Sequence, residues 1–281
     1  MTKHFNDIEY ELIDPTGNIT ALVRTAVDEA DQPRIAGLIL DAEESCEQVG
    51  FTGSSSGCDI ALRMAAGEFC GNAVMSTAAL YCDDNGIDKG QERTVHVCSS
   101  GCDKPLVVDI TRKEDKGQTH VYNGRVTMPD PRDISCHVFT YKDRFYDLPV
   151  VRFDGILHVI AKSGDISFPD EEMQGLIRDW CDQAGAECFG IMMTDIEDDL
   201  FFRSEAVNDK IMISMRPLVY VPMLSSCYWE NSCASGTTAV ASYLSHELGD
   251  EDITVGVKQR GGTLTVHIKD RQKILEGNVS I

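Results

Sequence analysis

The segment IEYELI (8–13) alternates apolar and polar positions with a period of two, as a half-buried strand does. Residues 28–44 instead place apolar side chains at helical spacing behind an acidic start, which predicts a helix. The turn DPTGN (14–18) follows the first alternating segment and predicts a reversal of the chain. Strands are expected at 8–13, 18–27, 46–51 and 60–67.

The remainder of the chain is also rich in strand patterns and contains few helical ones. A helix is predicted over residues 167–185, with Pro169 in its first turn and acidic residues beside it. The segment MPDPRD (128–133) interrupts the pattern, and we expect the chain to cross there between an N-terminal half (1–124) and a C-terminal half (125–269). The last strand (270–281) is expected to pack back onto the first half. Further strands are predicted at 93–98, 104–111, 118–128, 136–141, 157–161, 188–194, 200–206, 211–221, 261–268 and 273–281.

Two other helical patterns each begin at a cysteine. The sequences GEFCGNAVMSTAALY and ENSCASGTTAVASYL contain Cys70 and Cys233, and each is followed 16 residues after the cysteine by a glycine, a common helix stop. Small residues along both helices permit close packing, which suits a central helix surrounded by strands. The sequence therefore predicts one cysteine at the start of a buried helix in each half.

A cysteine at a helix start can serve acid-base chemistry. The free N–H groups and the positive end of the dipole favour a thiolate and bind carboxylates. Two such helix starts could hold one substrate carboxylate while a thiol stands on each face of its α-carbon, an arrangement suited to proton exchange there. Two core cysteines near helix starts, or a redox pair, are the alternatives that this pattern leaves open.

Composition limits the possible partners. The 281 residues carry a formal net charge of −21, so nucleic acid and anionic membrane are not expected as partners. No apolar run approaches the ~18 residues of a membrane span. The first residues do not resemble a signal peptide, and a cytoplasmic protein is expected. The 11 cysteines include no CxxC pair; we expect mostly buried thiols, no disulfide framework and no metal site.

The two cysteine motifs resemble those of the diaminopimelate epimerase family, which contains cofactor-independent racemases and epimerases with two catalytic cysteines. PTGNITALV (15–23), GILHVIA (155–161) and the closing strands GGTLTVHI and LEGNVSI also match that family. The resemblance implies an α+β fold of two pseudo-symmetric domains, each with strands wrapped around a central helix and with the active site in the inter-domain cleft. It also implies a homodimer.

The site residues follow from this resemblance. Cys70 and Cys233 would be the acid and base, and no cofactor would be needed. The substrate α-carboxylate would bind helix-start amides. Asn18 would touch the substrate, and His158 would assist the thiols or orient the α-amino group. The helix-start residues are Gly71, Asn72, Ala234, Ser235 and Gly236.

The substrate is expected to have a side chain other than that of diaminopimelate. The stretch before the second cysteine, VPMLSSCYWENSC, lacks the family's arginine, and Ile156 stands where the epimerases place an asparagine. ECFGIMMT lacks a second asparagine, so a distal amino-acid group would be poorly paired.

CEQVGF, GEFCGNAVMS and YWENSCASGT instead resemble the histidine racemases of opine-type metallophore biosynthesis. Glu47 and Glu230 then become candidates for contacting the imidazole or amino group of the substrate. The alternatives are a diaminopimelate epimerase, a racemase of another amino acid, a catalytically inactive relative that binds a small molecule, and a pyridoxal enzyme.

Overall fold

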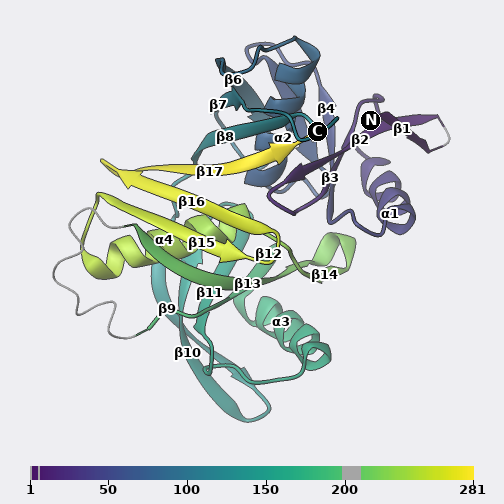
Figure 1. The fold of residues 1–281 in the computed structure, drawn as a ribbon. Helices are drawn as coiled ribbons and strands as arrows, with labels where there is room; N and C mark the ends of the chain where they lie inside the picture. The colour runs from purple at the N-terminus through teal and green to yellow at the C-terminus, as the bar shows by residue number, and fades with distance from the viewer. Residues whose placement is uncertain (1, 6, 198–209) are drawn as a thin grey trace. The chain divides into compact units, whose positions relative to one another are not determined.

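The computed structural model describes residues 2–5, 7–197 and 210–281. Its internal contacts divide the chain into two compact units, Met1–Met128 with Ile274–Ile281, and Pro129–Lys273. We call these the first and the second unit. The protein is of the mixed α+β type, with many strands and few helices (Figure 1). The strand predicted at 200–206 lies outside the described residues.

The strands of the first unit, apart from β1, pair with one another in a closed ring. Neighbours along the chain pair from β2 to β8, and β17 pairs with both β8 and β2. A short strand, β1, pairs antiparallel with β2 at one side. The bounds are β1 (Thr2–Phe5), β2 (Ile8–Pro15), β3 (Thr20–Val23), β4 (Gln48–Gly53), β5 (Ile60–Met64), β6 (Glu92–Ser99), β7 (Leu106–Arg112), β8 (Val121–Met128) and β17 (Gln272–Ser280).

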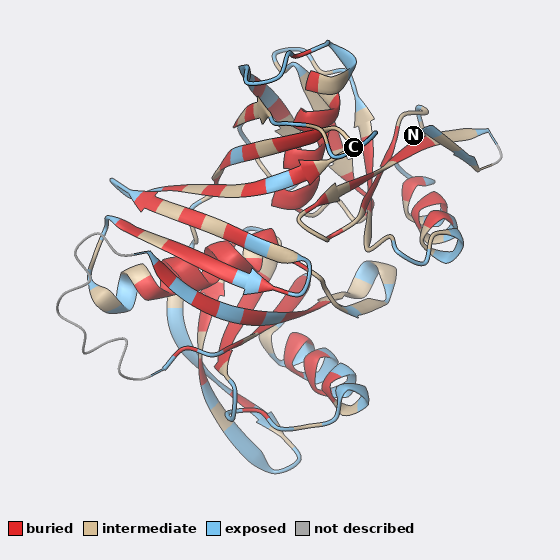
Figure 2. Cartoon of the chain, viewed as in Figure 1, coloured by how far each residue is buried: buried red, intermediate tan, exposed pale blue. Residues whose placement is uncertain are grey.

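Helix α2 (Gly71–Asp84) packs against β2, β3 and β5–β8 of this ring. It is buried along nearly its whole length (Figure 2). Ala73, Ala78 and Ala79 are fully buried, and these small side chains allow the strands to approach the helix closely. The other helix of the unit, α1 (Gln32–Ala42), packs on β4.

The second unit is a sheet with a helix packed on each of two sets of strands. Strands β9 to β13 pair in chain order, and β13 also pairs with β15, which pairs with β16. Helix α3 (Asp170–Ala184) packs on β9, β12 and β13, and α4 (Ala234–Leu248) packs on β10–β12, β15 and β16. The strands are β9 (Asp133–Tyr141), β10 (Arg144–Arg152), β11 (Ile156–Lys162), β12 (Cys188–Thr194), β13 (Ile211–Val221), β14 (Ser226–Trp229), β15 (Ile253–Gln259) and β16 (Gly262–Lys269).

No helix within the described ranges is both long and apolar enough to cross a membrane.

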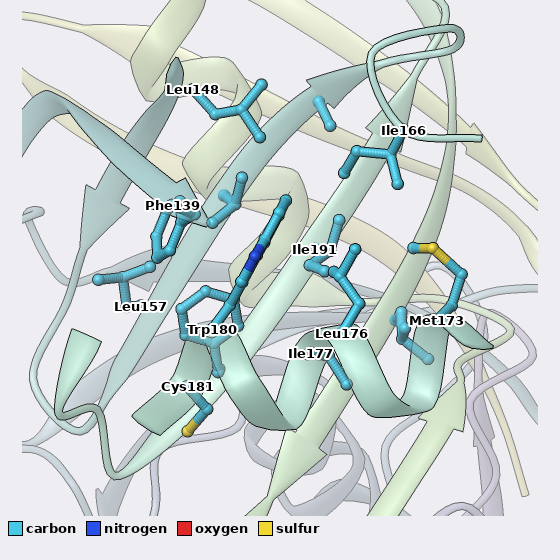
Figure 3. Close-up of a cluster of buried hydrophobic side chains, with 14 of the residues drawn as sticks. Phe139, Leu148, Leu157, Ile166, Met173, Leu176, Ile177, Trp180, Cys181 and Ile191 are labelled. Carbon is cyan, nitrogen blue, oxygen red and sulfur yellow. The ribbon is translucent and has the colours of Figure 1, made fainter. Parts of the chain in front are cut away.

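The apolar side of α3 packs into a hydrophobic core cluster of the second unit (Figure 3). The ring of Trp180 stacks on Phe139 of β9 with centroids 4.8 Å apart, and Phe189 of β12 meets Phe139 edge-on. The polar side of α3 faces solvent (Figure 2). This one-sided burial matches the helical spacing of apolar residues in the sequence.

Four strands were not anticipated from the pattern: β1, β10, β14 and β15. Strand β10 contains Pro149, which argues against a strand within a sheet because proline lacks an N–H donor. Pro149 pairs with Cys136 of β9, whereas the pairing with β11 covers only Val150–Arg152, so Pro149 has a strand partner on one side only. The helix expected at 28–44 is shorter than predicted, with Asp31 at its N-cap and Ala42 at its end.

The expectation of unpaired thiols is wrong for two of the cysteines. Cys58 and Cys98 form a disulfide with their Cα atoms 5.8 Å apart. The parallel pairing of β5 with β6 places Ala61 opposite Cys98, and this brings the loop before β5 to the same place. Cys82, Cys181, Cys188 and Cys233 are free and buried, so the expectation that most of the cysteines are buried thiols is also wrong, because it holds for fewer than half of them.

Replacing the core aromatic residue by Phe139→Ala should destabilise the second unit. The free energy of unfolding is expected to fall by about 3–5 kcal/mol, because a large buried ring is removed from a packed cluster. The matched control is Phe145→Ala in β10 of the same hairpin, where the side chain is 79% exposed; its effect should stay within about 0.5 kcal/mol. Urea denaturation measures both, and equal losses would contradict the assigned core.

Candidate active site

Cys70 stands at the start of α2, as the sequence predicted. It is the N-cap residue, with an extended backbone (φ −138°, ψ 111°), and its carbonyl accepts the N–H of Val74. The Cys70 side chain is partly exposed, and its S–H donates to Oε1 of Gln48 over 3.0 Å. The first sulfur is therefore accessible and oriented by a neutral amide.

Cys233 stands at the start of α4 with nearly the same backbone conformation (φ −125°, ψ 113°). Its side chain is buried, and Sγ accepts the N–H of Gly236 over 3.4 Å. The backbone N–H of Cys233 donates to Oε1 of the buried Gln259 over 2.8 Å, and Nε2 of Gln259 donates to the hydroxyl of Thr237. These contacts fix the position of Cys233 at the helix start.

The charge environment of Cys233 opposes its ionisation. Burial raises the pKa of the thiol well above its usual value, and the nearby carboxylate of Glu230 raises it further. Hydrogen bonds from Ser235 and Gly236 act in the opposite direction. The structure thus places Glu230 beside the second sulfur, where a carboxylate can accept the thiol proton.

His158 reaches Cys233 through a serine. Nε2 of His158 lies 2.9 Å from Oγ of Ser235, which lies 3.6 Å from Sγ of Cys233. His158 is fully buried, and burial lowers its pKa to about 3, so the imidazole is neutral at physiological pH. The resemblance suggested a role beside the thiols, and in this structure one hydroxyl separates the ring from the sulfur.

A glycine makes room for this imidazole. Gly190 pairs with His158 across β11 and β12, and a Cβ at position 190 would collide with Nδ1 of His158. Gly236 is similar, because a Cβ there would collide with Met192. A side chain at position 190 would therefore displace the imidazole, and one at position 236 would displace the end of Met192 and crowd the sulfur of Cys233.

Asn18 and Glu47 lie together in the first unit. Nδ2 of the buried Asn18 donates to Oε2 of Glu47 over 2.8 Å. A carboxylate only accepts hydrogen bonds, so Glu47 fixes the orientation of the amide. Oδ1 of Asn18 has no hydrogen-bond partner in the part of the chain that the structure describes, and it is available to accept from an N–H group.

The remaining predicted residues occupy the first turns of the two helices. Gly71 and Asn72 begin α2, and Ala234, Ser235 and Gly236 begin α4. Except for the half-buried Ser235, these residues are buried. Their roles in binding a carboxylate stay a prediction.

Sequence reasoning missed two glutamines that contact the cysteines. Gln48 follows Glu47 in CEQVGF, a segment that carried the resemblance. Nothing in the sequence indicated its contact with Cys70. Gln259 ends β15, a strand that the pattern did not reveal. A polar side chain at a strand end is too common to identify either one without the fold.

The whole chain is similar to a family of known proteins. A family model described as the histidine racemase CntK N-terminal domain matches residues 7–281. A histidine racemase of Fusobacterium nucleatum (strain ATCC 23726) is 31% identical over 98% of this chain and 94% of its own length. A histidine racemase of Staphylococcus aureus (strain Mu50) is 25% identical over 93% of this chain and 89% of its own.

Solved structures support the fold at lower identity. A phenazine biosynthesis protein of the PhzF family from Enterococcus faecalis aligns with a TM-score of 0.57 at 16% identity, over 99% of this chain and 96% of its own. A phenazine biosynthesis PhzC/PhzF protein from Clostridium difficile (strain 630) aligns with a TM-score of 0.53 at 14% identity, over 97% and 96%. The fold is therefore similar to that of the PhzF proteins.

The buried neutral imidazole predicts a dependence of stability on pH. The pKa of His158 is lowered from 6.5 to about 3 in the folded protein, so on acidification the unfolded chain binds its proton first. Stability should fall as pH drops from about 6.5 towards about 3, by up to about 1.4 kcal/mol per pH unit.

Urea denaturation at several pH values tests this dependence with His158→Gln. The variant should lose stability less steeply on acidification than the parent protein, whereas a matched change of the exposed His4 to Gln should leave the slope unaltered. Equal slopes for all three proteins would mean that His158 protonates without unfolding.

Proposed function

We infer that this chain, which belongs to the histidine racemase CntK family, is an isomerase that interconverts L- and D-histidine. The observation that carries this conclusion is the similarity to curated histidine racemases over nearly the full length of both chains. Racemisation requires removal of the α-proton from one face of the substrate and delivery of a proton to the other.

We propose that Cys70 and Cys233 perform these two transfers. A thiolate takes the α-proton and leaves the electron pair on the α-carbon, while the opposite thiol donates its proton to the other face. The proposal is supported by the position of each cysteine at the N-cap of a buried helix. It requires both sulfurs to reach the same α-carbon.

The substrate carboxylate is proposed to bind at the helix starts. The negative charge that develops on removal of the α-proton spreads into the carboxylate, and N–H groups at a helix start stabilise it. Gly71 and Asn72 would provide such groups from α2, and Ala234, Ser235 and Gly236 from α4. No cofactor is needed for this chemistry.

The residues around Cys233 suggest how its thiolate forms. Glu230 raises the pKa of the thiol as a neighbouring anion, and its carboxylate can take the thiol proton when substrate binds. Ser235, held by the neutral His158, then faces the sulfur as a hydrogen-bond donor. Asn18, oriented by Glu47, would accept an N–H of the substrate, either from the imidazole or from the α-ammonium group.

A wider relationship to the diaminopimelate epimerase family is part of the proposal. It is supported by the two cysteine-capped helices and by the strands that pack on each of them. The pseudo-symmetry of two such halves belongs to the same proposal. Histidine is preferred over diaminopimelate because the segment before Cys233 contains no arginine for a distal carboxylate. A homodimer and the supply of D-histidine to a metallophore stay predictions from resemblance.

Isotope exchange tests the proposed reaction. Purified protein incubated with L-histidine in D₂O should yield D-histidine deuterated at the α-carbon without any added cofactor, because the donated proton comes from a solvent-exchanged thiol. Chiral chromatography with mass spectrometry measures the product.

The alternatives predict different results in this assay. Turnover of diaminopimelate without exchange of histidine would favour an epimerase. Binding of histidine without exchange would favour an inactive relative. Activity that depends on added pyridoxal phosphate would contradict the two-thiol mechanism.

Replacing one sulfur at a time should separate the two proton transfers. Cys70→Ser and Cys233→Ser should each lower racemisation by about a hundredfold or more, because general acid-base catalysis contributes about 10²–10⁴. Each variant should still exchange the α-proton of one enantiomer with retention, and the favoured enantiomer should differ between them. NMR of the α-proton in D₂O measures the exchange.

The control for these variants is Cys136→Ser, which changes an exposed free cysteine on β9. It should leave racemisation unchanged. Full racemisation by either active-site variant would show that its sulfur does not transfer a proton.

A further inference from the structure

A chain of hydrogen bonds leads from the sulfur of Cys70 into the first unit. The Cys70 S–H donates to Oε1 of Gln48 over 3.0 Å, and Nε2 of Gln48 donates to Oγ1 of Thr20 over 2.7 Å. The hydroxyl of Thr20 donates to the main-chain oxygen of Asn18 over 3.1 Å. Thr20 is fully buried, so its hydroxyl is shielded from solvent.

The direction of each hydrogen bond is fixed by chemistry. A main-chain oxygen only accepts, so Thr20 must donate its single hydroxyl proton to Asn18. The oxygen of Thr20 therefore accepts, and the group of Gln48 that faces it must be the amide NH₂. The carbonyl oxygen of Gln48 then necessarily faces the sulfur of Cys70.

The carbonyl oxygen of Gln48 favours one protonation state of that sulfur. It accepts a hydrogen bond from a thiol and repels a thiolate, and an amide does not take up the proton as a carboxylate would. Cys233 differs, because its sulfur accepts the N–H of Gly236 and because the neighbouring carboxylate of Glu230, which opposes a thiolate while it is charged, can itself take up the thiol proton. The two sulfurs are thus surrounded by unlike groups.

We propose that Gln48, oriented by Thr20, is a positioning residue that holds Cys70 as a thiol and makes it the proton donor of the resting enzyme. The Cys233 thiol gives its proton to Glu230, and the resulting thiolate takes the α-proton, leaving the electron pair on the α-carbon. Cys70 then donates its proton to the opposite face and becomes a thiolate. Glu230 then releases its proton to water, and Cys70 recovers a proton from water, which repulsion from the Gln48 oxygen favours.

Only the role of Cys70 as acid rests on the proposed function; its state as a thiol does not. The experiment therefore reads the thiol directly. The rate of alkylation by iodoacetamide is measured between pH 6 and 10, and modification at Cys70 is quantified by tandem mass spectrometry. Only the thiolate reacts, so the midpoint of the rate profile reports ionisation, while its plateau reports access.

Three variants test the orientation of Gln48. Gln48→Met removes the acceptor, and Thr20→Val leaves Gln48 in place but frees its amide to turn. Both should move the midpoint to lower pH and speed the alkylation of Cys70 at pH 7 by about three- to tenfold, the size expected for one hydrogen bond. Gln48→Glu keeps an acceptor and adds charge, so the midpoint should move to higher pH.

Thr52→Val is the matched control for Thr20→Val. Its hydroxyl also donates to a main-chain oxygen in this sheet, that of Val23, and the midpoint for Cys70 should not move. Circular dichroism establishes that each variant is folded.

Two results would overturn the proposal: a changed plateau with an unchanged midpoint, or equal midpoints in Thr20→Val and Thr52→Val variants. The expected shift in a protein that fails to racemise histidine would support Gln48 as a positioning residue and reject the proposed function. Racemisation of histidine by a protein whose midpoints do not move in these variants would support the proposed function and reject Gln48 as a positioning residue.

Discussion

The start of a buried helix is the constraint on which the candidate site depends. The first N–H groups of a helix have no partner within it, and the first turns of α2 and α4 are buried apart from the half-buried Ser235. In α4 the sulfur of Cys233 accepts one of these groups, that of Gly236. The requirement for acceptors at a helix start makes the same place suitable for a sulfur anion and for a carboxylate.

The two helix starts share a backbone conformation but differ in their neighbours. Cys70 faces the amide of Gln48, whereas Cys233 has a carboxylate, a serine and a buried imidazole around it. Similar backbones satisfy the common need to present a sulfur at a helix start. Unlike neighbours can assign different proton affinities to the two sulfurs, which a reaction with one acid and one base requires at each turnover.

A glycine and two glutamines fix the positions of His158 and the two cysteines. Gly190 leaves room for His158, and Gln259 ties the backbone of Cys233 to Thr237. Gln48 and Thr20 connect Cys70 to the turn that carries Asn18. Buried polar groups of this kind are costly unless each has a partner, so the position of one member restricts the others.

The sequence by itself determined the two cysteine-capped helices, the one-sided core helix α3 and most strands, because these depend on periodicity and local stop signals. It also marked Asn18, Glu47, His158 and Glu230 through resemblance. Only the tertiary structure decided that Cys58 pairs with Cys98, that Gln48 and Gln259 contact the cysteines, and that His158 reaches Cys233 through Ser235. These contacts join residues far apart in the chain, and hydrogen-bond partners depend on strand register rather than on local pattern.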